Sequence, residues 1–295
     1  MQKGVGILPG EILFIINPNS GRQNSKKIIE RIKQYDDHLD YTVTRNTQAV
    51  DDLFENLNKK YKAVVIVGGD GTINSSLPYF LKNPNLVLAV LPNGSGNGFA
   101  RDLGFDWNLD QLMTSFRKGE VVHLDLLEIN GELAINVSGL GIDSYVAYHF
   151  QHSKSRGLRN YVLATARAMV QFRDFDAEIR TQEGKYKGKF RMISVANTSQ
   201  FGNNARIAPL ARPYGGQYVM ALVKPFPAWK YPEFIFRMFT GKLKSSKYIQ
   251  YLILDEHAEI SWEKTKYHLD GEPKDSEGDL YIKLLAGQVK VLKRF

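Results

Sequence analysis

Apolar runs alternate with amphipathic stretches along the first 120 residues. Continuous apolar runs at 12–16, 63–67 and 86–91 indicate buried strands, and residues 41–44 add a shorter β-type segment. Apolar residues at helical spacing predict helices over 24–35, 49–58, 74–81 and 110–118. Strands that are apolar throughout and alternate with helices are typical of a parallel sheet covered on both faces. The pattern therefore predicts an α/β domain.

The pattern changes near Val121. Short β-type segments recur at 121–129, 132–137, 177–181, 189–196, 217–223, 249–254, 257–262, 280–285 and 288–292. Helical spacing returns only at 161–172 and 231–239. Many short strands with turn signals predict a β-sandwich-like second domain. We therefore expect domains at 1–122 and 123–295, with the last strand as a candidate to pack back on the first domain.

Composition narrows the class of protein. The 295 residues are 43% hydrophobic and 24% charged, as in an ordinary globular protein, and no apolar run approaches the roughly 18 residues of a membrane span. Absence of cysteine excludes disulfides and thiolate chemistry, and the N-terminus lacks the features of a secretory signal, so we expect a cytoplasmic protein. The net charge of +8 favours an anionic partner such as nucleotide phosphates or an acidic lipid surface. No nucleic-acid-binding motif occurs, so nucleic acid is not expected as a partner.

Polar, glycine-containing loops follow three of the predicted strands, at residues 17–21, 68–72 and 92–97. The carboxyl ends of parallel strands meet at one edge of a sheet, where ligands bind. Glycines allow close backbone approach, and N–H groups at a helix start attract anions. The loops therefore predict a site for a nucleotide with several phosphates. The phosphate-binding P-loop pattern and the dinucleotide fingerprint are both absent from the sequence.

Asp70 is the acidic member of these loops. Its carboxylate could hold a magnesium ion or handle a hydroxyl proton. The alternative is a tight strand-to-helix turn that binds no ligand. The six histidines show no zinc-site spacing.

Five motifs carry a resemblance to a known family. They are Asn17-Pro-Asn-Ser-Gly21, Gly68-Gly-Asp-Gly-Thr-Ile-Asn74, Leu91-Pro-Asn-Gly-Ser-Gly-Asn97, Asn136-Val-Ser-Gly-Leu-Gly-Ile-Asp143 and Leu269-Asp-Gly-Glu-Pro273. In this order they resemble the diacylglycerol kinase catalytic-domain family, which also contains sphingosine and ceramide kinases and soluble bacterial lipid kinases. The resemblance extends from about residue 12 to 292. It implies an NAD kinase/diacylglycerol kinase-like α/β domain, a β-sandwich-like second domain and an active site in the interdomain cleft.

The resemblance also implies an activity, transfer of the γ-phosphate of ATP to a hydroxyl of a diacylglycerol-like or sphingoid-like lipid. Asp70, Asp270 and Glu272 are then the expected catalytic residues. Asp70 would hold Mg²⁺, and Asp270 or Glu272 would take the proton from the lipid hydroxyl. The residues expected to bind ATP are Asn17, Pro18, Asn19, Ser20, Gly21, Thr44, Gly68, Gly69, Asp70, Gly71, Thr72, Asn74, Gly94, Ser95 and Asn97.

Two departures from the family pattern bear on the substrate and the metal. Gly98 stands where many relatives have aspartate, which is more similar to the sphingoid-base or ceramide kinase branch. The turn at 213–217 lacks the acids that carry a structural magnesium ion in many bacterial relatives. A second metal site is therefore not expected.

Alternatives remain open at this stage. Asp270-Gly-Glu-Pro273 alone is an ordinary hairpin turn, and Asn136 and Asp143 fit turn and cap chemistry equally well. An NAD kinase-like phosphotransferase with a soluble acceptor, or a non-catalytic nucleotide- or lipid-binding regulator, would share this fold. Aromatic residues and lysines over 226–247 would either rest on an anionic inner-membrane surface or belong to a helix packed on the β-domain.

Overall fold

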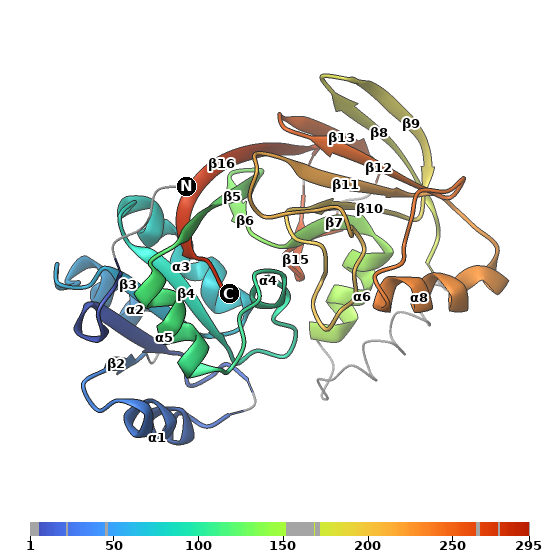
Figure 1. Ribbon diagram of the computed structural model, residues 1–295. Helices are drawn as coiled ribbons and strands as arrows, with labels where there is room; N and C mark the ends of the chain where they lie inside the picture. The colour runs from blue at the N-terminus through green and yellow to red at the C-terminus, as the bar shows by residue number, and fades with distance from the viewer. Residues whose placement is uncertain are drawn as a thin grey trace. The chain divides into compact units, whose positions relative to one another are not determined.

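The computed structural model describes residues 6–21, 23–44, 47–151, 168, 172–263, 266–276 and 278–294 (Figure 1). The chain divides into two compact units. The first comprises Met1–Leu124 together with Gly287–Phe295, and the second comprises Asp125–Ala286. The final residues thus return to the unit in which the chain began.

The first unit contains the predicted parallel sheet. Strands β1 (Ile12–Ile16), β2 (Asp40–Val43), β3 (Ala63–Gly68) and β4 (Val87–Pro92) run parallel in the order β2-β1-β3-β4. Every residue of β1 and β3 is buried, which explains their uninterrupted apolar sequence. The helical elements are η1 (Pro9–Glu11), α1 (Ser25–Tyr35), α2 (Thr47–Glu55), α3 (Asp70–Lys82), α4 (Gly98–Asp102) and α5 (Leu109–Lys118).

Local sequence defines the ends of these helices. The side chain of Asn24 accepts a hydrogen bond from the Lys26 N–H and begins α1, and Asn108 does the same for α5 through the Gln111 N–H. Helix α5 ends at Gly119, whose φ of 63° suits glycine. Each helix buries an apolar stripe, Ile28 and Ile32 in α1 and Leu109, Leu112, Met113 and Phe116 in α5.

The C-terminal segment completes this unit. Val291, at the end of β16 (Leu280–Leu292), pairs in parallel with Leu88 of β4. The Arg294 side chain is 3% exposed and donates hydrogen bonds to Asp106 at 2.6 Å and to Gln111 at 3.2 Å. The sequence predicted two strands here, but β16 is continuous through Gly287, because glycine tolerates the φ of 64° at that point.

The second unit contains two antiparallel sheets and confirms the predicted β-sandwich-like fold. One sheet joins β16, β13 (Ala258–Trp262), β8 (Phe175–Thr181) and β9 (Gly184–Phe190), and β5 (Val121–Ile129) pairs with β6 (Glu132–Ala134). The other has the order β12 (Ile249–Leu254), β11 (Tyr218–Val223), β10 (Met192–Ala196), β7 (Val137–Gly141), β14 (Lys266–Leu269) and β15 (Glu272–Asp275). Its helical elements are α6 (Ile142–Gln151), η2 (Ala228–Lys230) and α8 (Tyr231–Phe239).

Strand β11 shows why the second sheet is apolar throughout. Tyr218, Met220 and Leu222 point into a core shared with β8 and β13. The alternate residues, Val219, Ala221 and Val223, point to the opposite face and join a cluster with α6 and α8. The sheet is therefore buried on both faces, because successive side chains of a strand point to opposite sides.

Several predicted elements differ in extent. Helix α3 begins at Asp70, four residues earlier than predicted. The predicted strand at 132–137 is divided into β6 and β7, and the one at 189–196 into β9 and β10. Elements that the pattern did not predict are η1, α4, α6, η2, β14 and β15. The helix predicted over 161–172 lies outside the described residues, apart from Ala168 and Phe172.

Candidate active site

Hydrogen bonds tie together the three loops that follow β1, β3 and β4. Asn17 Nδ2 donates to Thr72 Oγ1 at 2.9 Å, which joins the first loop to the second. Asn93 Nδ2 donates to the Ser20 carbonyl at 2.6 Å, and the Asn93 N–H donates to the Gly68 carbonyl at 2.7 Å. The polar loops thus form one surface at the carboxyl edge of the sheet.

The first loop is shaped by its own side chains. The Asn19 N–H donates to Asn17 Oδ1 at 2.9 Å, and Ser20 Oγ donates to the Asn17 carbonyl at 2.9 Å. Gly21 closes the loop with a φ of 85° and packs directly on the third loop. A Cβ atom at Gly21 would lie 1.1 Å from the Asn93 carbonyl oxygen, so no other residue fits this conformation.

Two glycines bring the second and third loops into direct backbone contact. A Cβ atom on Gly94 would lie 2.6 Å from the Gly69 Cα atom, and one on Gly69 would lie 3.0 Å from the Gly94 Cα atom. Asn97 then folds the third loop back on itself, accepting from the Gly94 N–H at 2.8 Å and donating to its carbonyl at 2.9 Å. Side chains are thereby excluded from this floor, which leaves backbone groups for a bulky anion.

Asp70 lies in the first turn of α3 rather than in an open loop, which corrects the predicted helix start. Its Oδ2 atom accepts from the Gly98 N–H at 2.9 Å, and its Oδ1 atom accepts from the Phe99 N–H at 3.1 Å. The carboxylate therefore sits at the N-terminus of the short helix α4, where a negative charge is favoured.

A pocket of about 200 Å³ opens beside the third loop. Trp107 forms part of its wall and donates from Nε1 to the Pro92 carbonyl at 2.7 Å, with the Arg31 guanidinium 4.7 Å from the ring centroid. The pocket is lined by Gln23, Pro92, Asn93, Gly94, Ser95, Asn97, Arg101 and Trp107. Of these, Gln23, Arg101 and Trp107 lie outside the motifs. Asn93 lies inside one of the motifs, but the sequence gives no indication that it joins two loops by hydrogen bonds.

The other predicted nucleotide residues occupy the same unit. Thr44 is buried at the end of β2, and its hydroxyl lies 3.4 Å from the Ile16 carbonyl. Pro18 and Asn19 are exposed in the first loop, and Gly71 and Asn74 belong to α3.

In the second unit, the predicted acidic loop is the turn of the β14–β15 hairpin. Asp270 and Gly271 have φ angles of 49° and 87°, as the two central residues of a tight hairpin turn require. Asp270 accepts hydrogen bonds from the Ile135 N–H at 2.8 Å and the Asn136 N–H at 2.9 Å. Glu272 follows the turn and is exposed. The two acids of this motif therefore have different environments, one anchored to backbone and one open to solvent.

A buried polar cluster lies behind this hairpin. Ser194 Oγ donates to Asp143 Oδ2 at 3.0 Å, and His268 Nε2 lies 3.3 Å from the same oxygen. Nδ1 of His268 accepts from the Gly271 N–H at 3.1 Å, so the imidazole proton belongs on Nε2, facing the carboxylate. Oδ1 of Asp143 also accepts from the Ser144 N–H at 2.8 Å, within the first turn of α6. The spacing of Ser194 and His268 gave no indication that they meet Asp143.

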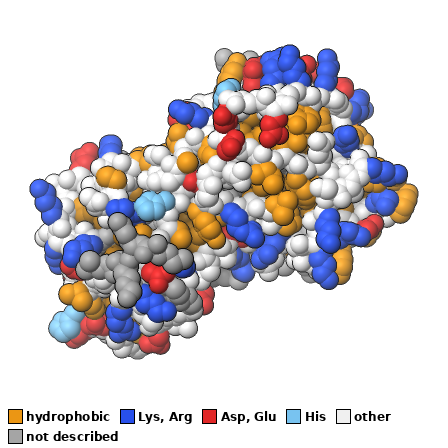
Figure 2. Space-filling model, turned by 45° about the horizontal axis from the view of Figure 1, so that its top comes forward, with side chains coloured by type: hydrophobic (Ala, Val, Ile, Leu, Met, Phe, Trp, Pro, Cys, Tyr) orange, Lys and Arg blue, Asp and Glu red, His pale blue; other side chains and the backbone are white. Residues whose placement is uncertain are grey.

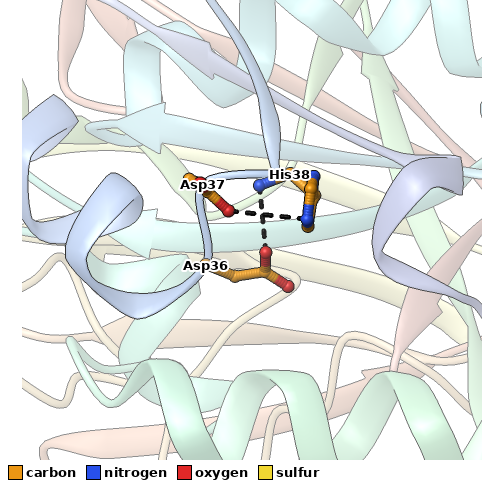
Figure 3. A group of neighbouring side chains, drawn as sticks. All are labelled: Asp36, Asp37 and His38. Carbon is orange, nitrogen blue, oxygen red and sulfur yellow. Dashed lines mark hydrogen bonds and ion pairs between the residues drawn. The ribbon is translucent and has the colours of Figure 1, made fainter.

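One group of carboxylate and imidazole side chains, among the residues that the structure describes, lies close enough together to share a cation: Asp36, Asp37 and His38 (Figure 3). Asp36 Oδ1 accepts from the His38 N–H at 2.9 Å, and His38 Nε2 lies 3.6 Å from Asp37 Oδ1. These contacts are those of a surface turn after α1. They give no reason to place a metal there.

The loops of the first unit fit nucleotide phosphates and a magnesium ion. The glycine floor would allow the backbone to approach phosphate oxygens, and the Asp70 carboxylate would supply an oxygen ligand for the ion. Magnesium in proteins is bound through one or two carboxylates together with substrate phosphates, so a single carboxylate is sufficient.

Comparisons with known proteins establish the family. A family model for the diacylglycerol kinase catalytic domain matches residues 11–129, and one for the YegS C-terminal NAD kinase β-sandwich-like domain matches residues 136–293. The chain therefore belongs to the family of lipid kinases that combines these two domains. No helix within the described residues is long and apolar enough to cross a membrane.

Individual relatives show the extent of the similarity. The chain is 24% identical over 268 residues to the diacylglycerol kinase of Bacillus subtilis, covering 88% of each protein. A Staphylococcus haemolyticus protein is 26% identical, and that match spans 57% of each chain. A crystal structure of a diacylglycerol kinase from Bacillus anthracis has the same fold, with a TM-score of 0.74, 18% identity and 97% of each chain covered.

Proposed function

We propose that this protein is an ATP-dependent lipid kinase that transfers the γ-phosphate of ATP to a hydroxyl group of a lipid. The observation that carries the proposal is the Asp70 carboxylate, which is held by the Gly98 and Phe99 N–H groups where three glycine-bearing loops are tied together. Phosphoryl transfer depends on positioned phosphates and charge neutralisation, and this arrangement supplies residues for both.

The residues of the first unit take the nucleotide side of the reaction. The loops at 17–21, 68–72 and 92–97 bind the phosphates through backbone N–H groups and the hydroxyls of Ser20, Thr72 and Ser95. Asp70 holds the metal ion. When bound, magnesium neutralises negative charge on the phosphates. The pocket beside the third loop is smaller than the 300–1,000 Å³ typical of ligand pockets, so it suits phosphate groups rather than a whole nucleotide.

Glu272 is our candidate for the general base. A base needs a carboxylate that is available to accept a proton from the substrate hydroxyl. The Asp270 carboxylate accepts from two backbone N–H groups and anchors its hairpin to residues 135 and 136. Glu272 is exposed and free to change partners. We therefore assign Asp270 a positioning role and Glu272 the proton transfer.

The identity of the acceptor lipid is the first test. Purified protein would be incubated with radiolabelled ATP, magnesium and a panel of diacylglycerol, sphingosine, ceramide, phosphatidylglycerol and NAD, each lipid in detergent micelles. We expect label in a lipid product, since both matching domain families belong to lipid kinases. Label in NAD alone would instead support an NAD kinase-like enzyme. ATP binding without transfer to any acceptor would support a non-catalytic regulator.

Glu272→Gln should lower kcat by about a hundredfold, because general bases typically contribute 10²- to 10⁴-fold. Its melting temperature should match the wild type, since the side chain is exposed. Asp270→Asn is the comparison, and it should lower the melting temperature because one carboxylate oxygen that accepts a backbone N–H is replaced by an amide NH₂. Unchanged kcat in Glu272→Gln would exclude it as the base.

A further inference from the structure

Residues 224–249 carry an unusual concentration of positive charge. They include six Lys and Arg and one acidic residue, so their net charge of +5 is more than half of the chain's +8. We call the surface formed by η2, α8 and the following loop at 240–248 the basic-aromatic surface. Figure 2 shows Lys and Arg side chains beside hydrophobic ones along the right-hand margin of the molecule.

The inner face of α8 fixes this surface to the second unit. Phe226, Phe234 and Met238 are buried in the cluster that covers the outer face of the β10–β11 sheet. The Arg206 N–H donates to the Met238 carbonyl at 3.0 Å, which adds a backbone anchor at the end of the helix. Part of the prediction of a helix packed on the β-domain is therefore correct. The packing leaves the opposite side of the helix uncovered.

Large aromatic side chains project from that opposite side. Trp229 is 73% exposed and Phe236 is 62% exposed. Trp229 lies in η2, directly before α8, whereas Phe236 and the exposed Pro232 are four residues apart on one face of α8. Exposed aromatics gathered on one face mark an interaction surface, because their contact with water is unfavourable. Tryptophan in particular favours membrane–water interfaces.

Basic side chains surround these aromatics. A groove of about 250 Å³ between α8 and the following loop is lined by Lys230, Arg237, Lys244 and Lys247, among others. Lys230 Nζ lies 4.7 Å from the Trp229 ring centroid, so the exposed tryptophan has a positive charge directly beside it. The one acid, Glu233, contacts Arg237 at 2.8 Å and Lys230 at 3.8 Å, and the net charge of the surface remains positive.

We propose that the basic-aromatic surface docks on the surface of a bilayer that contains anionic phospholipids. Trp229 and Phe236 insert between the headgroups, and Lys230, Lys244 and Lys247 bind lipid phosphates. The combination matches the chemistry of an interfacial helix, which joins an apolar face to a basic border. The biological purpose of this docking rests on the proposed lipid kinase activity, but the binding itself can be measured without turnover.

The test uses co-sedimentation with vesicles in the absence of ATP. Vesicles of phosphatidylcholine alone would be compared with vesicles containing roughly one third phosphatidylglycerol, a composition that gives an anionic surface. Two double variants address the two components, Trp229→Ala/Phe236→Ala and Lys244→Glu/Lys247→Glu. All four residues are exposed, so the fold should tolerate the changes. The matched charge control is Lys185→Glu/Lys187→Glu on β9, where both lysines are also exposed.

The wild type should bind the anionic vesicles at least tenfold more tightly than neutral ones, and added salt should weaken that binding. Each double variant of the basic-aromatic surface should lose at least tenfold in affinity. For Lys244→Glu/Lys247→Glu, removing two positive charges at roughly 1 kcal/mol each alone corresponds to a loss of about thirtyfold, and the two added negative charges oppose binding further. For Trp229→Ala/Phe236→Ala, the loss comes from the apolar side chains that no longer insert between the headgroups. The control on β9 should bind like the wild type. Phosphorylation of a lipid dispersed in detergent micelles should be the same in all variants.

Three results would overturn the proposal. The protein could bind neutral and anionic vesicles equally well, the β9 control could lose as much vesicle binding as the two other variants, or single-stranded DNA could bind the basic-aromatic surface whereas vesicles do not. Vesicle binding without kinase activity would contradict the proposed function but support the docking surface. Kinase activity in micelles without vesicle binding would support the proposed function but contradict the docking surface.

Discussion

Asp70→Asn should lower kcat by about a thousandfold while the protein stays folded. The substitution removes the negative charge that would hold the metal ion beside the phosphates. Single electrostatic groups in active sites contribute about 10²- to 10³-fold to the rate. Asparagine keeps one oxygen for the Gly98 or Phe99 N–H and presents an NH₂ group to the other. The cost in unfolding free energy should therefore be about 1–2 kcal/mol.

The measurement is steady-state turnover with the lipid identified by the panel, together with a thermal melt. Asp110→Asn is the control for the lost charge, because Asp110 is exposed in the first turn of α5. The control should turn over like the wild type. Activity of Asp70→Asn within a few-fold of the wild type would contradict both the metal role of Asp70 and the use of this site for phosphoryl transfer.

Gly141→Ala should destabilise the second unit by about 3 kcal/mol, since a left-handed backbone and a clash both oppose the new side chain. Gly141 has a φ of 109° in the sheet interior. A Cβ atom there would lie 2.5 Å from the Arg191 carbonyl oxygen and 2.8 Å from the Phe175 ring. The glycines of the fourth motif thus serve packing between strands.

Gly131→Ala separates the cost of the positive φ from the cost of the clash. Gly131 has a similar positive φ of 83°, but nothing lies within 4 Å of a Cβ atom built there. This variant should lose only about 1 kcal/mol, the cost of the backbone conformation. Urea unfolding followed by circular dichroism gives both values. Equal losses in the two variants would show that the clash at Gly141 is relieved and that the motif has another purpose.

The layers of the fold could be predicted because the pattern of apolar residues along the chain reflects which positions are buried. The fully apolar β1, β3 and β4 could only be strands covered on both faces, and the structure confirms this. Helix α6 escaped prediction because it follows β7 directly, and the glycines of that junction indicate a turn rather than the start of a helix. Strands β14 and β15 escaped because they are only four residues long and polar in part. Short elements of this kind depend on tertiary pairing rather than on local pattern.

The site was predictable where its chemistry is local. Glycine-rich loops after strands predict an anion site. In the structure, Gly21, Gly69 and Gly94 form a floor without side chains. Long-range ties were not predictable, because nothing in the spacing of Asn17 and Thr72 or of Asn93 and Ser20 connects them. The partnership of Asp143, Ser194 and His268 likewise depends on strand register. Register is set by the whole sheet and cannot be derived from the residues of one motif.

The return of the C-terminal residues to the first unit has a consequence for synthesis on the ribosome. Val291 pairs with Leu88, and Lys290 donates to Asn85 across 205 positions of sequence. The parallel sheet of the first unit therefore lacks its pairing with β16 until residue 291 has left the exit tunnel. Contacts of such long separation form slowly. The second unit, Asp125–Ala286, has all of its residues available earlier and can fold before the first unit is complete.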